Sequence, residues 1–81
     1  MVKAYVLIET AVGELPSVAK KLKLLKGVQT VDIVTGPYDI IALVEGRDLN
    51  ETSEIVTSHM HTIPGIIRTL TCVSLNGRTG N

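Results

Sequence analysis

The residues best suited to bind a small molecule form a short polar break, Thr35-Gly36-Pro37-Tyr38-Asp39, between two apolar runs. Both runs are strand-like, and a break this short between two strands predicts a β-hairpin. The loop combines a flexible Gly, a rigid Pro, an aromatic ring and a carboxylate, which is more than a plain connection requires. Asp39 either accepts hydrogen bonds from a ligand or caps its own turn through an Asx-type bond, and the residues alone leave both interpretations open.

Few other residues have a spacing that predicts chemistry. Thr69 and Thr71 point to one face of a predicted strand, although the β-propensity of Thr explains them better than a binding role does. Cys72 has no partner motif for nucleophilic catalysis and is expected to be a buried small hydrophobe. His59 and His61 are two positions apart in a predicted helix, so they point to different sides and do not predict a metal site. We therefore expect no catalytic residue, no metal and no cofactor.

The elements that must position the loop follow from the periodicity of the apolar residues. Gly and Pro punctuate the boundaries between these elements, and Asp48 with Glu51 resembles a capping box at the start of the second helix. The predicted strands cover residues 2–10, 28–35, 39–45 and 66–75, and the predicted helices cover residues 15–25 and 49–63.

This order, βαββαβ, predicts an α+β fold, a ferredoxin-like sandwich with an antiparallel four-stranded sheet. Because βαβ crossovers are right-handed, both helices should cover one face of that sheet. We expect one domain over residues 1–75 and a flexible, Gly-rich tail over residues 76–81.

Composition limits the classes of function. The chain has 81 residues, with eight basic and eight acidic side chains, so it lacks the basic surface that phosphate contacts usually need. Its two aromatic residues, Tyr5 and Tyr38, are too few for a base-stacking sheet. No signal peptide pattern and no apolar run of roughly 20 residues is present, which predicts a cytoplasmic protein.

The uncovered face of the sheet predicts self-association. Three of the four predicted strands, 2–10, 39–45 and 66–75, are apolar on both faces. A monomer would leave one of these faces in water, where it would exceed the apolar patches that single proteins normally expose. We expect a homodimer in which the open faces of two copies bury each other, giving a dimeric α/β barrel.

Four segments together carry a family resemblance, namely Val34–Val44, Arg47–Leu49, Ile63–Ile66 and Arg68–Thr71. They resemble the effector domain of Lrp/AsnC-type transcription regulators, which is also called the RAM domain. The resemblance extends from the first predicted strand to Leu75. Full-length regulators of this family carry an N-terminal helix-turn-helix domain, whereas residue 1 here already begins the first strand. The chain thus resembles a stand-alone RAM domain, and direct DNA recognition is not expected.

The resemblance implies a dimer through the open sheet faces, assembly of dimers into rings that are commonly octamers, and amino-acid binding where dimers meet. The loop residues Gly36, Pro37, Tyr38 and Asp39 match the effector loop of the family. Its backbone groups and Asp39 would hold the charged ends of an amino acid, and Pro37 would stiffen the loop. Thr69 and Thr71 match positions that contribute hydroxyl groups to the same site.

We therefore expect an amino-acid-responsive, non-enzymatic oligomeric module that modulates transcription through a partner regulator, and a full-length Lrp/AsnC protein is one candidate for that partner. One alternative is a small dimeric α/β-barrel enzyme of the isomerase or monooxygenase type, in which His59 and Tyr5 would be the candidate catalytic residues. A second alternative is a structural module that binds no ligand.

Overall fold

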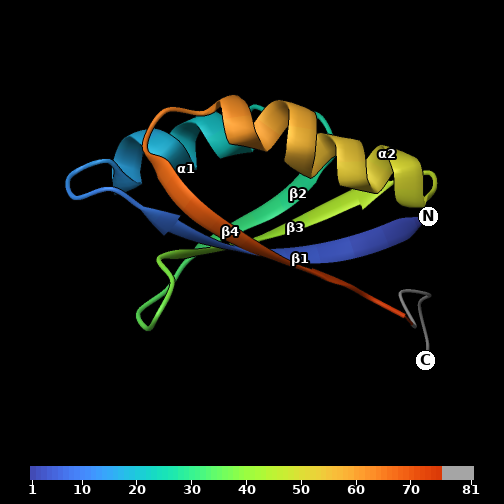
Figure 1. Cartoon of the computed structure of the whole chain (residues 1–81), viewed down its shortest axis with the longest axis horizontal. Helices are drawn as coiled ribbons and strands as arrows, with labels where there is room; N and C mark the ends of the chain where they lie inside the picture. Colours follow the sequence, from blue (N-terminus) through green and yellow to red (C-terminus); the bar gives the residue numbers. More distant parts are fainter. Residues whose placement is uncertain (76–81) are drawn as a thin grey trace.

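The computed structural model describes residues 1–75, so the predicted tail over 76–81 lies outside the described residues. Its elements follow the order βαββαβ, and the strands form one antiparallel sheet with the order β2-β3-β1-β4. Both helices cover the same face of this sheet (Figure 1). The predicted ferredoxin-like sandwich is confirmed. The elements are β1 (Val2–Thr10), α1 (Leu15–Lys23), β2 (Val28–Ile33), β3 (Ile40–Gly46), α2 (Leu49–Glu54), a π-helical turn (Ile55–His59), a 3-10 turn (Met60–Thr62) and β4 (Ile66–Val73).

The hydrophobic core lies between the sheet and the helices. Alternate residues of the two central strands point into it, as the period of two in a strand requires. The helices contribute an apolar stripe from α1 and a second one from the α2 segment. The strand residues of the core are Ala4, Val6, Ile8, Ile40, Ala42 and Val44, and the main helical residues are Val18, Leu22, Ile55, Val56 and Met60.

The turn from α1 into β2 depends on Gly27. This residue has a φ of 93°, a conformation that glycine adopts without steric cost. A Cβ atom at this position would also overlap with the Cδ1 atom of Ile55, which packs directly over the glycine. Gly27 therefore shapes the turn directly before β2 and at the same time lets the second helical segment approach the sheet.

The predicted second helix is not a single regular α-helix. It begins at Leu49 as predicted, but its α-helical part ends at Glu54 and continues as a π-helical turn and a 3-10 turn. The hydroxyl group of Thr57 donates a hydrogen bond to the carbonyl oxygen of Ser53 at 3.1 Å. Such bonds compete with the regular ladder, and the run of β-branched residues around Val56 is a weak helix former. Local chemistry thus loosens a helix whose apolar stripe still faces the core.

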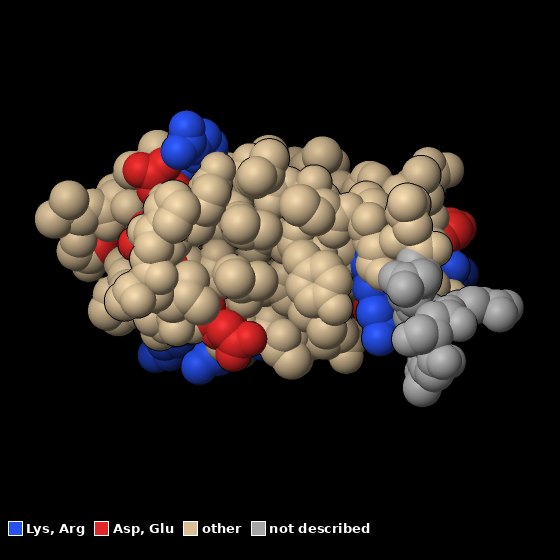
Figure 2. Space-filling view, turned by 90° about the horizontal axis from the view of Figure 1, so that it is seen from below, with Lys and Arg blue, Asp and Glu red and all other residues tan. Residues whose placement is uncertain are grey.

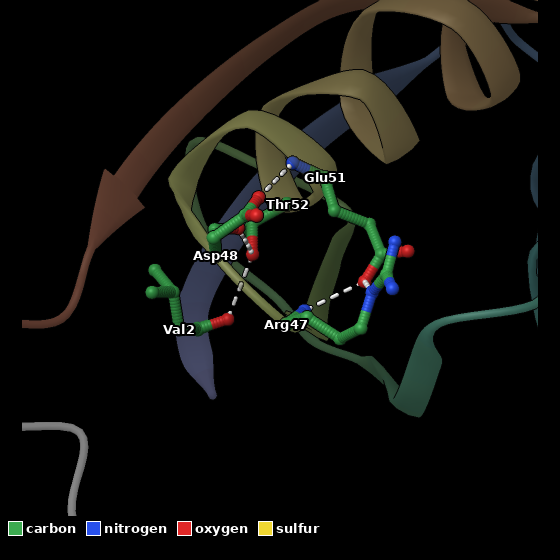
Figure 3. A network of polar contacts seen from close by, with 5 residues as sticks. All are labelled: Val2, Arg47, Asp48, Glu51 and Thr52. Atoms are coloured by element: carbon green, nitrogen blue, oxygen red, sulfur yellow. Dashed lines mark hydrogen bonds and ion pairs between the residues drawn. The ribbon is translucent and has the colours of Figure 1, made fainter.

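A polar network fixes the start of α2 (Figure 3). The Oδ1 atom of Asp48 accepts a hydrogen bond from the backbone N–H of Glu51 at 2.8 Å, which confirms the predicted N-cap. The return bond differs from a standard capping box, because Glu51 Oε1 accepts from the backbone N–H of Arg47, at 2.6 Å, and from its Nε, at 3.3 Å. The hydroxyl of the buried Thr52 lies 2.9 Å from the carbonyl oxygens of both Val2 and Asp48. The network therefore ties the helix to the first residue of β1.

The same network makes the stability sensitive to acid. The hydrogen bond from the backbone N–H of Arg47 holds the pKa of Glu51 below its usual value of 4.5, and the Arg47 side chain adds to this effect. A lowered pKa in the folded state means that the ionised carboxylate stabilises the fold. This contribution is present above pH 4.5 and is lost as the pH falls through the lower pKa of the folded state.

We expect Asp48→Ala to lower the free energy of unfolding by about 1 kcal/mol, because the N–H of Glu51 loses its acceptor. Urea unfolding followed by circular dichroism measures this change. Glu54→Ala is the matched control, since it removes a carboxylate from the exposed last residue of the same helix and should change stability by less than about 0.5 kcal/mol. An equal loss in both variants would show that the cap has no special role.

We expect Glu51→Gln to change the pH dependence of unfolding rather than only its midpoint. The variant should be less stable than the wild type near neutral pH, and the difference should shrink as the pH falls below 4.5. Urea midpoints measured across this pH range test the prediction. A difference that stays constant with pH would mean that the lost packing of the side chain, and not its charge, is responsible.

Candidate functional site

The loop between β2 and β3 is attached to the sheet through Asp39. The backbone N–H of Asp39 donates to the carbonyl oxygen of Ile8 at 2.9 Å, and its own carbonyl accepts from the N–H of Val34 at 2.9 Å. Its Oδ2 atom accepts from the backbone N–H of Thr10 at 2.8 Å and from the Thr10 hydroxyl at 3.2 Å. The carboxylate thus binds β1 instead of capping its own turn. Both of these bonds use Oδ2, and within residues 1–75 the other carboxylate oxygen of Asp39, Oδ1, accepts neither of them.

Tyr38 connects the loop to the other side of β1. The guanidinium carbon of Arg68 lies 5.6 Å from the centroid of the Tyr38 ring, which is within cation–π range. The Nη2 atom of Arg68 also forms an ion pair with Glu9 Oε1 at 3.2 Å. Sequence reasoning missed Glu9, Thr10 and Arg68 as neighbours of the loop. The sequence offered one signal for these neighbours: Glu9 and Arg68 have opposite charges, and the two residues are partners in the β1–β4 register.

The tip of the loop is open. Gly36 and Pro37 are exposed, and no atom outside the immediate neighbours lies within 4 Å of the position that a Cβ atom would take at Gly36. The loop bends to the side of the sheet opposite the helices (Figure 1). A ligand could therefore approach the tip directly, but one subunit alone would not enclose it.

Thr69 and Thr71 lie on the other face of the sheet. They pair with Ile8 and Val6, whose side chains point toward the helices, so the two hydroxyl groups share the helix-facing side of β4. The Thr69 hydroxyl is 3.0 Å from Nε2 of His61. A single subunit therefore brings Gly36 to Asp39 together but does not bring Thr69 or Thr71 to this cluster.

The face of the sheet opposite the helices carries a set of apolar residues that we call the open-face patch. It consists of Tyr5, Leu7, Ile41, Leu43, Leu70 and Cys72, which are neighbours in the strand register. Tyr5 is 45% exposed and Leu70 is 49% exposed. In Figure 2, charged side chains surround a broad uncharged area on this face. The expectation that Cys72 is buried is wrong for the single subunit, because the uncovered face of an edge strand leaves it exposed.

A surface hollow lies at the opposite end of β3 from the loop. It has a volume of about 670 Å³ and is lined mainly by polar residues that include Lys26, Arg47, Glu54 and His59. Tyr5 lies on the open face instead, so the two residues considered for an enzyme do not share a cavity. We regard the charged cluster at the loop as the better candidate site, since its groups are held by specific contacts whereas the hollow is a half-open surface depression.

The part of the chain that the structure describes offers no grouping for a metal ion and no membrane-spanning helix. Within residues 1–75, no three His, Cys, Asp or Glu side chains gather as a metal ion would require. None of the helices there has the length and apolar character needed to cross a membrane.

The fold and the loop agree with a known family. The family model of the Lrp/AsnC ligand binding domain matches residues 3–78, which is nearly the entire chain. The chain therefore belongs to the Lrp/AsnC ligand binding domain family, a class of regulatory effector-binding modules.

Solved structures support this assignment. The protein TTHA0845 of Thermus thermophilus superposes with a TM-score of 0.90 at 32% identity, and the match covers 96% of this chain and 98% of that one. AsnC of E. coli superposes with a TM-score of 0.85 at 27% identity, covering 91% of this chain and 50% of AsnC. The transcriptional regulator NMB0573 of Neisseria meningitidis, solved in complex with L-Met, has the same fold with a TM-score of 0.82 at 15% identity, covering 94% of this chain and 51% of the regulator.

Part of an enzyme is also similar in sequence. Homocitrate synthase of Sulfurisphaera tokodaii is 34% identical over 59 residues, which is 73% of this chain. The matched stretch is only 13% of the length of that enzyme. The similarity therefore concerns a small part of the enzyme.

Proposed function

We propose that this protein is a non-enzymatic, amino-acid-responsive module that works as a homo-oligomer in the cytoplasm. The observation that carries the proposal is the cluster at the loop, where Asp39 is bonded to Thr10 and the Tyr38 ring lies beside the Glu9–Arg68 ion pair. An amino acid carries an ammonium and a carboxylate group, so it needs an acceptor and several donors close together. The cluster offers both kinds of group on an accessible surface.

The proposed site is completed by a second subunit. Gly36, Pro37, Tyr38 and Asp39 come from one subunit, and Thr69 and Thr71 would come from a neighbouring one. Support for this arrangement comes from the two threonines, which lie on the helix-facing side of β4, whereas the loop of the same subunit bends to the opposite side of the sheet (Figure 1). A ligand that touches both subunits would favour the assembled state, since it binds that state more tightly.

Assembly would begin with a homodimer through the open-face patch, and dimers would join into an octamer or a similar ring. The patch groups six apolar or weakly polar side chains that the helices leave uncovered. Contiguous exposed patches of this kind usually mark interaction sites. A two-fold axis would bring identical patches together and remove both from water.

The output of the module would be control of transcription through a partner that contacts DNA, such as a full-length Lrp/AsnC regulator. AsnC is about twice as long as the match, so the same domain occurs there beside further chain. A second candidate output is control of a biosynthetic enzyme, which the resemblance to part of homocitrate synthase favours. In both cases the module would respond to an amino acid, and only the protein that it controls would differ.

Ligand binding can be tested by thermal unfolding with each standard amino acid at millimolar concentration. A ligand present at about 100 times its dissociation constant stabilises the folded state by about 2.7 kcal/mol, which for a domain of this size raises Tm by on the order of 10 °C. We expect one amino acid, or a small group of similar ones, to produce such a shift. A panel without any stabilising amino acid would contradict the proposed function.

We expect Asp39→Ala to abolish the ligand-induced shift while the dimer persists, because Asp39 lies in the loop and outside the open-face patch. The unliganded variant should also lose about 1–3 kcal/mol of stability, since the N–H and hydroxyl of Thr10 lose their acceptor. Calorimetric titration and sedimentation measure the two effects. Asp32→Ala is the matched control, because it removes an exposed carboxylate from β2 and should leave ligand binding intact.

We expect Leu43→Glu to convert the dimer into a monomer, because the change places a charge within the open-face patch. Leu24→Glu is the control, since Leu24 is 79% exposed at the end of α1 and lies outside the sheet. Sedimentation at micromolar concentration distinguishes the two states. A wild-type protein that sediments as a stable monomer would rule out the proposed dimer.

A further inference from the structure

We infer that Glu9 and Arg68 are ligand-binding residues of the loop site, an inference that rests on the proposed function. In the unliganded subunit these residues neutralise each other. When an α-amino acid binds, its carboxylate takes the place of Glu9 on the Arg68 guanidinium, and its ammonium group binds between Glu9 and Asp39. The structure thus assigns the two charged ends of the ligand to two specific positions.

The strand register places the three charged residues in one row across the sheet. Glu9 on β1 is the direct partner of Arg68 on β4. On the other side of β1, Asp39 bonds to the backbone of Ile8 and Thr10, the two neighbours of Glu9. The backbone bonds of Asp39 thus place this residue next to Glu9 along β1, and the Arg68 guanidinium faces Glu9 from β4 beside the Tyr38 ring.

The charge balance of the row favours a zwitterion with a defined orientation. Glu9 and Asp39 carry two negative charges, whereas Arg68 provides only one positive charge. An ammonium group placed between the two residues would be attracted by both carboxylates. The Oδ1 atom of Asp39 is available for this contact, because the bonds from Thr10 use Oδ2.

Exchange of the ion pair for the ligand should cost little energy. The side chains of Arg68 and Glu9 are 63% and 36% exposed, and ion pairs in such positions contribute little to stability. Arg68 can present its planar guanidinium to a carboxylate through two parallel hydrogen bonds. The Tyr38 ring beside it restricts the guanidinium to the neighbourhood of the loop, so less freedom is lost when the ligand binds.

The competing explanation is that the Glu9–Arg68 pair only holds β1 and β4 in register. The two explanations differ in what happens when the charges are exchanged. The double variant Glu9→Arg with Arg68→Glu keeps an ion pair across the two strands. It also places a cation beside Asp39, where the ammonium group of the ligand would bind, and an anion where its carboxylate would bind.

The test uses the full chain and, as the probe, the amino acid that gives the largest shift in the thermal panel. Its carboxamide, which lacks the carboxylate, and its α-hydroxy acid, which lacks the ammonium group, are titrated in parallel by calorimetry. We expect Arg68→Met and Glu9→Gln each to weaken binding of the amino acid at least tenfold, as the loss of a charge-assisted hydrogen bond predicts. Arg68→Met should also bind the amino acid and its carboxamide with equal affinity. Glu9→Gln should show a smaller difference in affinity between the amino acid and its α-hydroxy acid than the wild type does.

The charge-exchanged double variant should regain the thermal stability that the single variants lose, but it should not regain binding. The matched control is Lys3→Glu with Glu45→Lys, which exchanges the charges of partners on β1 and β3 at the far end of β1 and should bind like the wild type. The inference would be overturned if the Glu9–Arg68 double variant regained binding, or if the single variants weakened the binding of all three probes equally. Either result would leave the loop site itself in place. Absence of binding by the wild type would overturn the proposed function and this inference together.

Discussion

The structure depends on the register of β1 with its two neighbours. This register points Val6 toward the helices and Leu7 toward the open face, and it fixes which residues of β3 and β4 accompany each of them. A shift by one residue would exchange the two faces of β1, because side chains in a strand alternate with a period of two. The core, the open-face patch and the charged row at the loop therefore arise from one set of backbone hydrogen bonds.

The same pairing explains why the loop is held so closely to the sheet. β1 continues past Ile8, the partner of Ile40, which is the first residue of β3. The end of β1 at Glu9 and Thr10 therefore lies beside the segment of chain that leads into β3. Asp39 belongs to this segment and bonds to β1 with its backbone N–H and its carboxylate. The loop is thus anchored at its base while Gly36 and Pro37 at its tip stay open. A site built in this way combines a rigid frame with free access, which suits the binding of a small polar ligand.

Much of this arrangement could be predicted from the sequence, because local signals were strong. The alternation in β1, the apolar stripe of α1 and the cap at Asp48 each specify an element through residues that are close in the chain.

The predicted end of the last strand at residue 75 was two residues too far along the chain. The irregular winding after Glu54 was also missed, because side-chain bonds such as that of Thr57 compete with a regular helix. The partners of Asp39 and Arg68 could not be predicted, since they depend on contacts between residues about 30 or 60 positions apart. The exposure of Cys72 depends on which face the helices cover, which the residue type does not reveal.

The position of the charged row limits how tightly a single subunit can hold a ligand. Ligand sites normally bury most of the ligand surface, whereas the loop offers charged groups on one side and solvent on the other. Polar contacts that remain in water contribute little, because water competes for each of them. Closure by a second subunit would exclude this water and strengthen every contact in the row. The ligand would then gain affinity only in the assembled state, and the same free energy would favour assembly whenever the ligand is present. Coupling between ligand concentration and oligomeric state thus follows from the openness of the site, without any change in the fold of the subunit.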